Sequence, residues 1–302
     1  MSDTELADRF EELRPYLRRV AYSTLGSLAE ADDVVQDAWL RLQRVDATEI
    51  DNLRGWLTTV VGRLALDSLG SARSRRETYV GSWLPEPEVT QWDDPADRIS
   101  QDERVTMALL VVLETLSPAE RTAFVLQDVF GLSSGEVADV VGRTPAAVRQ
   151  LATRARKHVQ DGSPRFPAST TEHQRAVSAF AVAWRAGDLE ALLKVLGDDV
   201  TFTADGGGKV TAVARPLHGA DSVSSFLLRV ALTTLRSHGD QVRGGLVSVN
   251  GEPGLIIFDG KDLSVYSFVV ENDHITSIDV IRNPDKLRNV AVPDESSSRW
   301  FD

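Results

Sequence analysis

Apolar residues in the first 76 positions recur every three or four residues, the spacing typical of amphipathic helices. The pattern predicts a first helix through Leu6, Phe10 and Leu17, which Pro15 is expected to kink or restart. A second helix is expected from about residue 30 to residue 44, and a third from about residue 52. The predicted buried residues are Val34, Val35, Ala38 and Leu42 in the second helix and Leu53, Trp56, Leu57, Val60, Val61, Leu64, Ala65 and Leu69 in the third. Three such helices would pack as one small bundle.

The helical pattern returns near residue 100 and continues to residue 160, where it contains a predicted helix-turn-helix. Residues 133–141 form the first helix, Gly142 and Arg143 the turn, and Thr144 caps a second helix that Pro145 begins. The inward positions are Val137, Ala138, Val141, Val148, Leu151, Ala152 and Ala155, and the outward positions are Arg149, Gln150, Thr153, Arg154, Arg156 and Lys157. This segment is predicted to be a second all-helical domain.

The second helix of the motif has the composition of a helix that enters the major groove of DNA. Its first residues, including Thr144, are small, so that end could approach the base pairs closely. Arg149 and Gln150 are expected to reach base edges, since their side chains match the hydrogen-bonding groups displayed there. Arg143, Arg154, Arg156 and Lys157 are better placed for phosphates. By itself the motif also fits a helical hairpin with a solvated basic face, a response regulator or a repressor.

After residue 170 the pattern changes to short runs rich in Val, Ile, Phe and Thr, which are typical of strands. Two helices are expected at about 172–196 and another at about 219–236. The strand candidates are 200–204, 210–214, 241–249, 254–258, 263–270 and 275–281, and turn residues separate the last four. The pattern predicts a third, α+β domain, in which a curved sheet wraps on helices.

The distribution of charge matters more than the formal net charge of −12. Residues 143–157 contain five Lys or Arg residues and no acid, and residues 63–76 contain four Arg residues against one Asp. Between them, residues 86–103 hold seven acids against one Arg, together with several prolines that favour an extended linker. Two basic helical segments on either side of an acidic linker indicate two DNA contacts.

Other classes of function are made improbable by composition. No stretch approaches the roughly 18 uncharged apolar residues of a membrane span, so we expect a cytoplasmic protein. The absence of cysteine excludes disulfides and thiolate chemistry, and the five scattered histidines argue against a zinc site. No Gly-rich phosphate loop is present, and we expect no cofactor or metal.

Several blocks, in order, resemble the extracytoplasmic-function (ECF) sigma factors. ADDVVQDAWLR (31–41) is similar to the family's polymerase-binding helix, and LRGWL (53–57) with LALDSLGSARSRRE (64–77) to its −10 element helix. LSPAERTAFVLQDVFGLSSGEVADVVGRTPAAVRQLATRARK (116–157) is similar to region 4, which reads the −35 element. The resemblance covers about half of the chain. It implies two all-α sigma domains that bind promoter DNA and the β′ clamp and β flap of core RNA polymerase.

The resemblance assigns roles to particular side chains. On the second helix an acidic and apolar outer patch would meet a basic partner helix, although a solvated acidic face is the alternative; it consists of Asp33, Gln36, Asp37 and Leu40. The predicted −10 contacts are Arg63, Asp67, Ser68, Arg73, Arg75 and Arg76, where cations would hold a separated strand. Many family members place an asparagine at the position of Arg63, which leaves the base contact there open.

The C-terminal domain is similar to the SnoaL-like branch of the NTF2-like fold, a cone with an internal pocket, which a subgroup of these sigma factors carries. Three short runs support this: WLPEP (83–87), DGGGK (205–209) and NPDKL (283–287). The resemblance implies that this domain regulates the sigma domains through contacts with the linker. The expected contact residues are Trp83, Leu84, Pro85, Asp205, Gly206, Gly207, Gly208, Lys209, Asn283, Pro284, Asp285, Lys286 and Leu287. Alternatively, the glycines only form a turn, and Asn283-Pro284 only ends a strand.

We therefore predict a multidomain protein. Its expected parts are region 2 (1–79), a linker (80–102), region 4 (103–161), a second linker (162–170), the SnoaL-like domain (171–291) and a tail (292–302). Related cones house isomerases and cyclases, so an alternative is a sigma-like fusion with an enzyme or a ligand sensor. Asp205 or His218 would be the general base, and Trp184, Phe202 and Phe226 would line an apolar pocket containing Tyr266. A pocket that binds a small molecule without turnover is the more economical hypothesis.

Overall fold

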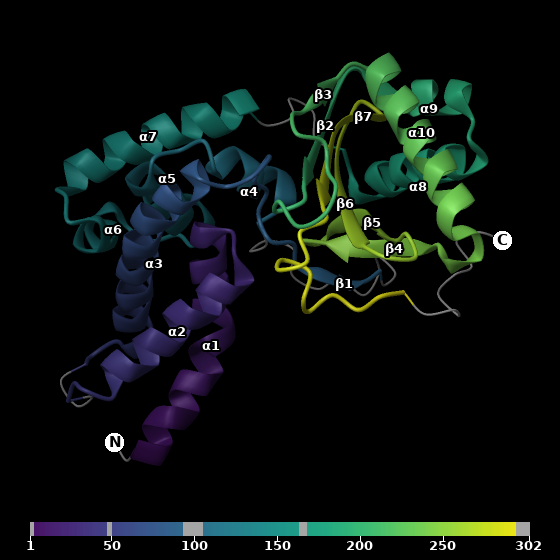
Figure 1. Cartoon of the computed structure of the whole chain (residues 1–302). Helices are drawn as coiled ribbons and strands as arrows, with labels where there is room; N and C mark the ends of the chain where they lie inside the picture. Colours follow the sequence, from purple (N-terminus) through teal and green to yellow (C-terminus); the bar gives the residue numbers. More distant parts are fainter. Residues whose placement is uncertain (1–2, 47–49, 93–104, 163–167, 294–302) are drawn as a thin grey trace. The chain divides into compact units, whose positions relative to one another are not determined.

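The computed structural model describes residues 3–46, 50–92, 105–162 and 168–293, and its described residues form two compact units (Figure 1). The first unit is helical and contains the described residues up to Thr78 and those from Leu109 to Gly162. The second contains Tyr79 to Trp92, a short piece at 106–108, and the described residues from Ala168 onward. Residues 80–92 of the predicted linker thus cluster with the C-terminal domain, as does Tyr79, which was predicted to end region 2.

Three long helices begin the helical unit: α1 (Asp3–Leu25), α2 (Leu28–Leu42) and α3 (Leu53–Glu77). Ser27 caps α2 by accepting a hydrogen bond from the backbone N–H of Glu30. The four residues predicted to be buried on α2 are buried. Of the two outcomes expected at Pro15, a restart is wrong, because α1 continues through that residue, and a kink stays a prediction. Apolar burial of Phe10 and Leu17 on either side offsets the hydrogen bond that proline cannot donate.

The rest of the helical unit consists of α4 (Met107–Leu113), apart from its first two residues, and of α5 (Pro118–Phe124), a π-helical turn η3 (Val125–Val129), α6 (Ser134–Val141) and α7 (Pro145–Gly162). Ser117 with Glu120 and Ser133 with Glu136 form capping boxes at α5 and α6. Gly142 ends α6 in the left-handed conformation that glycine adopts without strain. The predicted helix-turn-helix is confirmed. On α6, Val137 and Ala138 are buried as predicted, whereas Val140 is buried in place of Val141, which is half-buried.

The second unit is α+β, as predicted. Its helices are α8 (Thr170–Ala186), α9 (Leu189–Val195) and α10 (Ala220–His238), with a 3₁₀ turn η4 (Gly239–Gln241). Its strands are β1 (Val89–Gln91), β2 (Leu196–Asp205), β3 (Leu217–His218), β4 (Arg243–Val249), β5 (Glu252–Phe258), β6 (Leu263–Glu271) and β7 (His274–Ile281). They form one sheet in the order β1-β4-β5-β6-β7-β2-β3, in which only β2 and β7 pair in parallel. The three helices lie on one face of this curved sheet (Figure 1).

Alternate residues of the strands point toward these helices and form the core of this α+β unit, which we call the cone. Phe180 packs edge-on against Phe268, with ring centroids 5.2 Å apart, and Phe202 packs against Phe226 at the same separation. Trp184 lies next to Tyr266, 5.4 Å between ring centroids. The predicted strand at 210–214 is wrong: that segment is irregular, and β3 forms later, at Leu217–His218.

Strand β1 extends the sheet with a segment that the sequence pattern placed in an extended linker. Val89 pairs with Val249 and Gln91 with Val247, so β1 is antiparallel to β4. The side-chain oxygen of Asn250 accepts a hydrogen bond from the backbone N–H of Glu88, and the backbone N–H of Asn250 donates to the Glu88 carbonyl. The end of the described linker is therefore fixed to the cone by backbone pairing.

Candidate nucleic-acid interface and linker contacts

The predicted polymerase-binding patch on α2 lies on the solvent face of that helix. Asp33, Gln36 and Asp37 are exposed, and Leu40 is 43% exposed, an unusual position for a large apolar side chain. Apolar surface ringed by acids is suited to a partner helix that carries both apolar and basic side chains.

The predicted −10 helix, α3, packs against α6 within the helical unit. The guanidinium of Arg63 donates two hydrogen bonds to the carbonyl of Asp139, from Nε at 3.0 Å and from Nη2 at 2.8 Å. Gly62 lies so close to α6 that an added Cβ would be 2.9 Å from Val140 Cγ1. Asp67 is exposed and Ser68 is half-buried. The side chains of Arg73, Arg75 and Arg76 lie outside the described residues.

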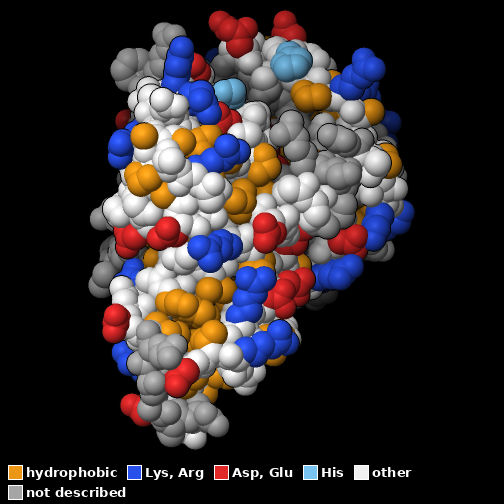
Figure 2. Space-filling model, turned by 90° about the vertical axis from the view of Figure 1, so that its left-hand side faces the viewer, with side chains coloured by type: hydrophobic (Ala, Val, Ile, Leu, Met, Phe, Trp, Pro, Cys, Tyr) orange, Lys and Arg blue, Asp and Glu red, His pale blue; other side chains and the backbone are white. Residues whose placement is uncertain are grey.

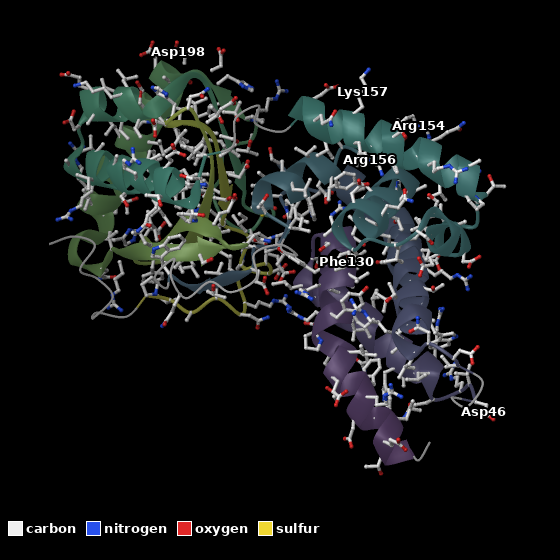
Figure 3. All side chains as sticks on the ribbon, turned by 180° about the vertical axis from the view of Figure 1, so that it is seen from behind. Asp46, Phe130, Arg154, Arg156, Lys157 and Asp198 are labelled. Carbon is white, nitrogen blue, oxygen red and sulfur yellow. The ribbon has the colours of Figure 1, made fainter. Side chains whose placement is uncertain are left out.

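On α7, the predicted base-contacting residues Arg149 and Gln150 are exposed, as are Arg143 and Thr144 at its start and Thr153 further along. Thr144 accepts a hydrogen bond from the N–H of Ala147 and so caps the helix. Lys157 points away from the neighbouring helices (Figure 3). These side chains face solvent, as a helix that reads DNA requires.

Two of the predicted phosphate contacts are paired with acids of their own unit. Arg154 donates to Glu120 at 2.7 Å, and Arg156 donates to Asp128 at 2.6 Å. Hydrogen bonds from Ser117 and then from Arg154 hold the pKa of Glu120 below its usual range. On the side of the molecule shown in Figure 2, basic and acidic side chains likewise lie next to one another at several points. A phosphate must compete with these carboxylates for both arginines.

A buried carboxylate joins the linker to the cone. Asp205, at the end of β2, is fully buried. Its Oδ1 accepts hydrogen bonds from the hydroxyl of Tyr79 at 2.6 Å and from the N–H of Gly207 at 3.0 Å. Its Oδ2 accepts from the N–H of Leu84 at 3.0 Å and from the ammonium of Lys286 at 2.7 Å. One side chain thus binds both ends of the linker segment 79–84.

The residues after β7 complete this cluster, which we call the linker clasp and define as Tyr79, Trp83, Leu84, Asp205, Asn283 and Lys286. The side-chain amide of Asn283 donates to the Tyr79 hydroxyl at 2.7 Å. The Lys286 ammonium also donates to the Leu84 carbonyl and lies 4.0 Å from the centre of the Trp83 ring. Burial, and then the hydrogen bond to Asp205, raises the pKa of Tyr79 well above its usual range. The clasp therefore holds a neutral phenol against a paired carboxylate.

The glycines of the 205–209 loop have a steric role. Gly207 and Gly208 have positive φ, and a Cβ on Gly207 would lie 2.4 Å from the Asn283 amide nitrogen. A Cβ on Gly208 would lie 3.0 Å from Val80 Cβ. Glycine is thus required for the loop to approach both the linker and the segment after β7.

The remaining predicted regulatory residues lie around the clasp. Pro85 and Leu287 are buried, Gly206 is buried at the start of the loop, and Pro284 is exposed. Lys209 and Asp285 form an exposed ion pair at 2.5 Å. The sequence pattern did not identify Tyr79. The available signal was that Tyr79 lies four residues before Trp83, in a segment with no helical or strand pattern to account for two large aromatic residues.

The residues proposed for catalysis do not form one site. Asp205 is enclosed in the clasp, and His218 is exposed on β3. Phe202 and Phe226 pack against each other in the core, whereas Trp184 and Tyr266 line a separate cavity. No described helix is long and apolar enough to cross a membrane.

Comparisons with known proteins agree with this architecture. The protein-family model of Sigma-70 region 2 matches residues 9–75, and the family model of Sigma-70 region 4 matches residues 106–159. The chain is 41% identical to the ECF RNA polymerase sigma factor SigJ of Mycobacterium tuberculosis, over 92% of both chains. It is 36% identical to the probable ECF RNA polymerase sigma factor SigI of the same species, over 91% of this chain and 92% of SigI. The crystal structure of M. tuberculosis SigJ superposes with a TM-score of 0.75 and 38% identity, covering 95% of this chain and all of that one.

Proposed function

Because the chain belongs to the ECF RNA polymerase sigma factors, we propose that its C-terminal cone regulates promoter recognition through the linker clasp. As an alternative sigma factor it joins core RNA polymerase and initiates transcription from promoter DNA. The observation that carries the proposal is the buried Asp205, which binds Tyr79 and Leu84 of the linker and Lys286 of the cone at once.

Three surfaces of the helical unit would carry the basic activity. The outer face of α2, with Asp33, Asp37 and Leu40, would bind the polymerase clamp. The N-terminal half of α7 would read the −35 element, with Arg149 and Gln150 at base edges. The polar side of α3 around Arg63 would bind the −10 element. Exposure supports the first two assignments, and the residue types support the third.

Promoter binding would require α3 and α6 to separate. The centres of elements named −35 and −10 are about 25 base pairs apart, which at about 3.4 Å per base pair is roughly 85 Å. Two helices in direct contact cannot read both elements, and the Asp139 carbonyl occupies two of the five N–H groups of Arg63 while the helices touch. The linker between the two readers sets how easily they separate, so a domain that holds the linker changes promoter affinity.

Run-off transcription with purified core polymerase and candidate promoters tests the basic function. The expected result is a promoter-dependent transcript, from the full chain and from a version that ends near Asp161. Absence of any such transcript from both forms, or of binding to core polymerase, would overturn the function.

A matched pair of variants tests the regulatory part. Lys286→Met removes the ammonium that binds Asp205 in the clasp, whereas Lys194→Met removes an exposed ammonium that binds Glu190 on α9. We expect Lys286→Met to change the yield of run-off transcript and Lys194→Met to leave it unchanged. Deletion from Asn283 onward should change transcription in the same direction as Lys286→Met. Identical transcription by all four forms would remove the regulatory role.

A further inference from the structure

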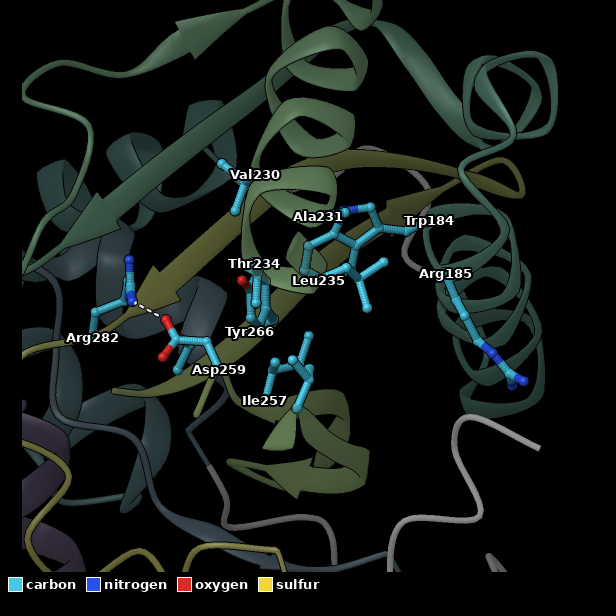
Figure 4. Close-up of a pocket in the computed structure, with 12 residues that line it drawn as sticks. Trp184, Arg185, Val230, Ala231, Thr234, Leu235, Ile257, Asp259, Tyr266 and Arg282 are labelled. Carbon is cyan, nitrogen blue, oxygen red and sulfur yellow. Dashed lines mark hydrogen bonds and ion pairs between the residues drawn. The ribbon is translucent and has the colours of Figure 1, made fainter. Parts of the chain in front are cut away.

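A cavity of about 130 Å³ lies between α10 and the concave face of the sheet (Figure 4). Its walls are mostly apolar, with Trp184, Ala231, Leu235 and Ile257 among the lining residues. The indole N–H of Trp184 already donates to the Leu227 carbonyl at 2.9 Å, so the indole offers the cavity only its apolar surface. An engineered apolar cavity of about 150 Å³ binds benzene. The volume therefore suits a molecule with a single ring.

One end of the cavity is polar, and its two carboxylates outnumber its one guanidinium. The Arg282 guanidinium donates to Asp259 at 2.8 Å and lies 3.8 Å from Asp262, while Nη1 donates to the Thr211 carbonyl. The Nε–H of Arg282 has no hydrogen-bond partner among the described residues, and it is too deeply buried for a ligand atom to reach. Because Asp259 and Asp262 together carry more charge than this guanidinium, an anionic ligand would be repelled at this end.

Tyr266 contributes a hydroxyl donor at this end of the cavity. Burial raises the pKa of Tyr266 to about 12, so its hydroxyl stays protonated at neutral pH. A protonated phenol favours an acceptor oxygen over a ligand with only donors. The polar end thus selects for a carbonyl or hydroxyl group.

Arg282 also connects the cavity to the linker clasp. Its side chain lines the cavity, and its backbone N–H donates to the carbonyl of Asp205 at 2.8 Å. The next residue, Asn283, donates its N–H to the same carbonyl and its side-chain amide to Tyr79. A ligand that fixes Arg282 therefore fixes the chain segment that holds the clasp closed.

We propose that this cavity binds an uncharged, single-ring organic molecule with one hydrogen-bond-accepting oxygen, and that its binding stabilises the closed linker clasp. The second part rests on the regulatory role of the clasp proposed above. A ligand that binds only the closed form stabilises it in proportion to its occupancy, without contacting DNA or polymerase.

Nuclear magnetic resonance of the full chain, titrated with three matched probes, tests the site. The probes are p-cresol, toluene, which lacks the oxygen, and 4-methylbenzoate, which is an anion. The indole N–H signal of Trp184, identified by its loss in Trp184→Phe, should shift saturably with p-cresol, more weakly with toluene, and not with 4-methylbenzoate. Failure of p-cresol to shift this signal, or stronger binding of the benzoate, would overturn the assignment.

Two pairs of variants locate the probe. Tyr266→Phe removes one hydroxyl and should weaken p-cresol binding about three- to tenfold while leaving toluene binding unchanged. Ala231→Phe fills the cavity and should abolish binding of both probes, whereas Leu232→Phe, at the next position of α10 and 52% exposed, should retain it. Equal effects of the two phenylalanine substitutions would place the probe elsewhere.

Exchange of the Leu84 amide hydrogen tests the coupling, since this N–H donates to Asp205 within the clasp. At p-cresol concentrations ten times its dissociation constant, exchange should slow about tenfold. Binding without slower exchange would refute the coupling and leave the site in place. Binding with slower exchange but unchanged run-off transcription would instead refute the regulatory role of the clasp, so the two failures can be told apart.

Discussion

The ion pair between Asp205 and Lys286 should be the contact of the linker clasp that is most sensitive to substitution of one partner. The carboxylate is fully buried and the lysine side chain is 11% exposed. Asp205→Asn keeps the shape of the side chain, removes its charge, and turns an NH₂ group toward donors that now lack an acceptor. Breaking a buried pair from one side costs about 3 to 5 kcal/mol, because the remaining charge stays buried without its partner. Lys286→Met leaves the carboxylate uncompensated and should have a cost of the same order.

The double variant Asp205→Asn/Lys286→Met separates the pair from its surroundings. An uncharged, well-packed replacement of a buried ion pair is often close to neutral, so the double variant should be much less destabilised than the sum of the single variants. We expect a coupling energy of about 2 to 3 kcal/mol. The exposed pair Lys209–Asp285, replaced in the same way, is the control and should give less than about 1 kcal/mol.

Amide exchange at Leu84 measures the free energy of clasp opening directly in the full chain. A coupling of about 2 to 3 kcal/mol corresponds to a deviation from additivity of roughly 30- to 150-fold in the exchange rate. The exchange rates give the change in opening free energy for each variant. If the change in the double variant equals the sum of the changes in the single variants within about 0.5 kcal/mol, the two side chains act independently, and the clasp is not organised around this pair.

Three further predictions concern the rest of the molecule. Arg149→Ala should cost about 1 to 3 kcal/mol of promoter affinity and relax one position of the −35 element in a binding assay with mutated promoters; equal weakening on all sequences would indicate a phosphate contact instead. Gly62→Ala should increase the distance between fluorophores on α3 and α6 and increase promoter binding, since the new methyl group would lie 2.9 Å from Val140 Cγ1; an unchanged distance contradicts the opening of this contact. Burial lowers the pKa of His173 to about 4 despite its hydrogen bond to the Pro253 carbonyl, so the unfolded chain takes up a proton near pH 6.5 that the folded cone excludes. Stability should therefore be complete above that pH and fall by up to about 3 kcal/mol as the pH is lowered toward 4; His173→Gln should abolish that loss in acid unfolding curves, and an identical pH dependence would exclude His173 as the cause.

The helices could be predicted because their signals are local. Caps at Ser117 and Ser133 and a turn glycine at 142 lie within a few residues of the ends they define. Apolar spacing on α2 likewise separated the buried Val34 from the exposed Asp33. In such segments the residues that decide the structure are neighbours along the chain.

The errors occurred where distant residues decide the structure. Val210 to Ala214 have strand composition, but the tight turn at Gly206–Gly208 diverts the chain and no strand of the sheet pairs with that segment. Strand β1 forms because Val89 meets Val249, 160 positions later, and three residues carry too little pattern to reveal it. The contact of Arg63 with Asp139 is equally invisible in the sequence, because a backbone carbonyl has no residue-specific signature.

The chemistry of the clasp is itself an argument that it opens. Apolar side chains of similar volume would hold the linker at least as tightly, because a buried ion pair gains little once the loss of hydration is counted. The two kinds of contact differ once they have separated: exposed apolar surface stays unfavourable in water, whereas the Asp205 carboxylate, the Lys286 ammonium and the Tyr79 hydroxyl all recover hydration. A clasp of charges and hydrogen bonds thus closes only when its groups are correctly placed, and it opens at a moderate cost in free energy. Those two properties allow a small change at Arg282, which directly follows the last paired residue of β7, to alter how often the linker is released.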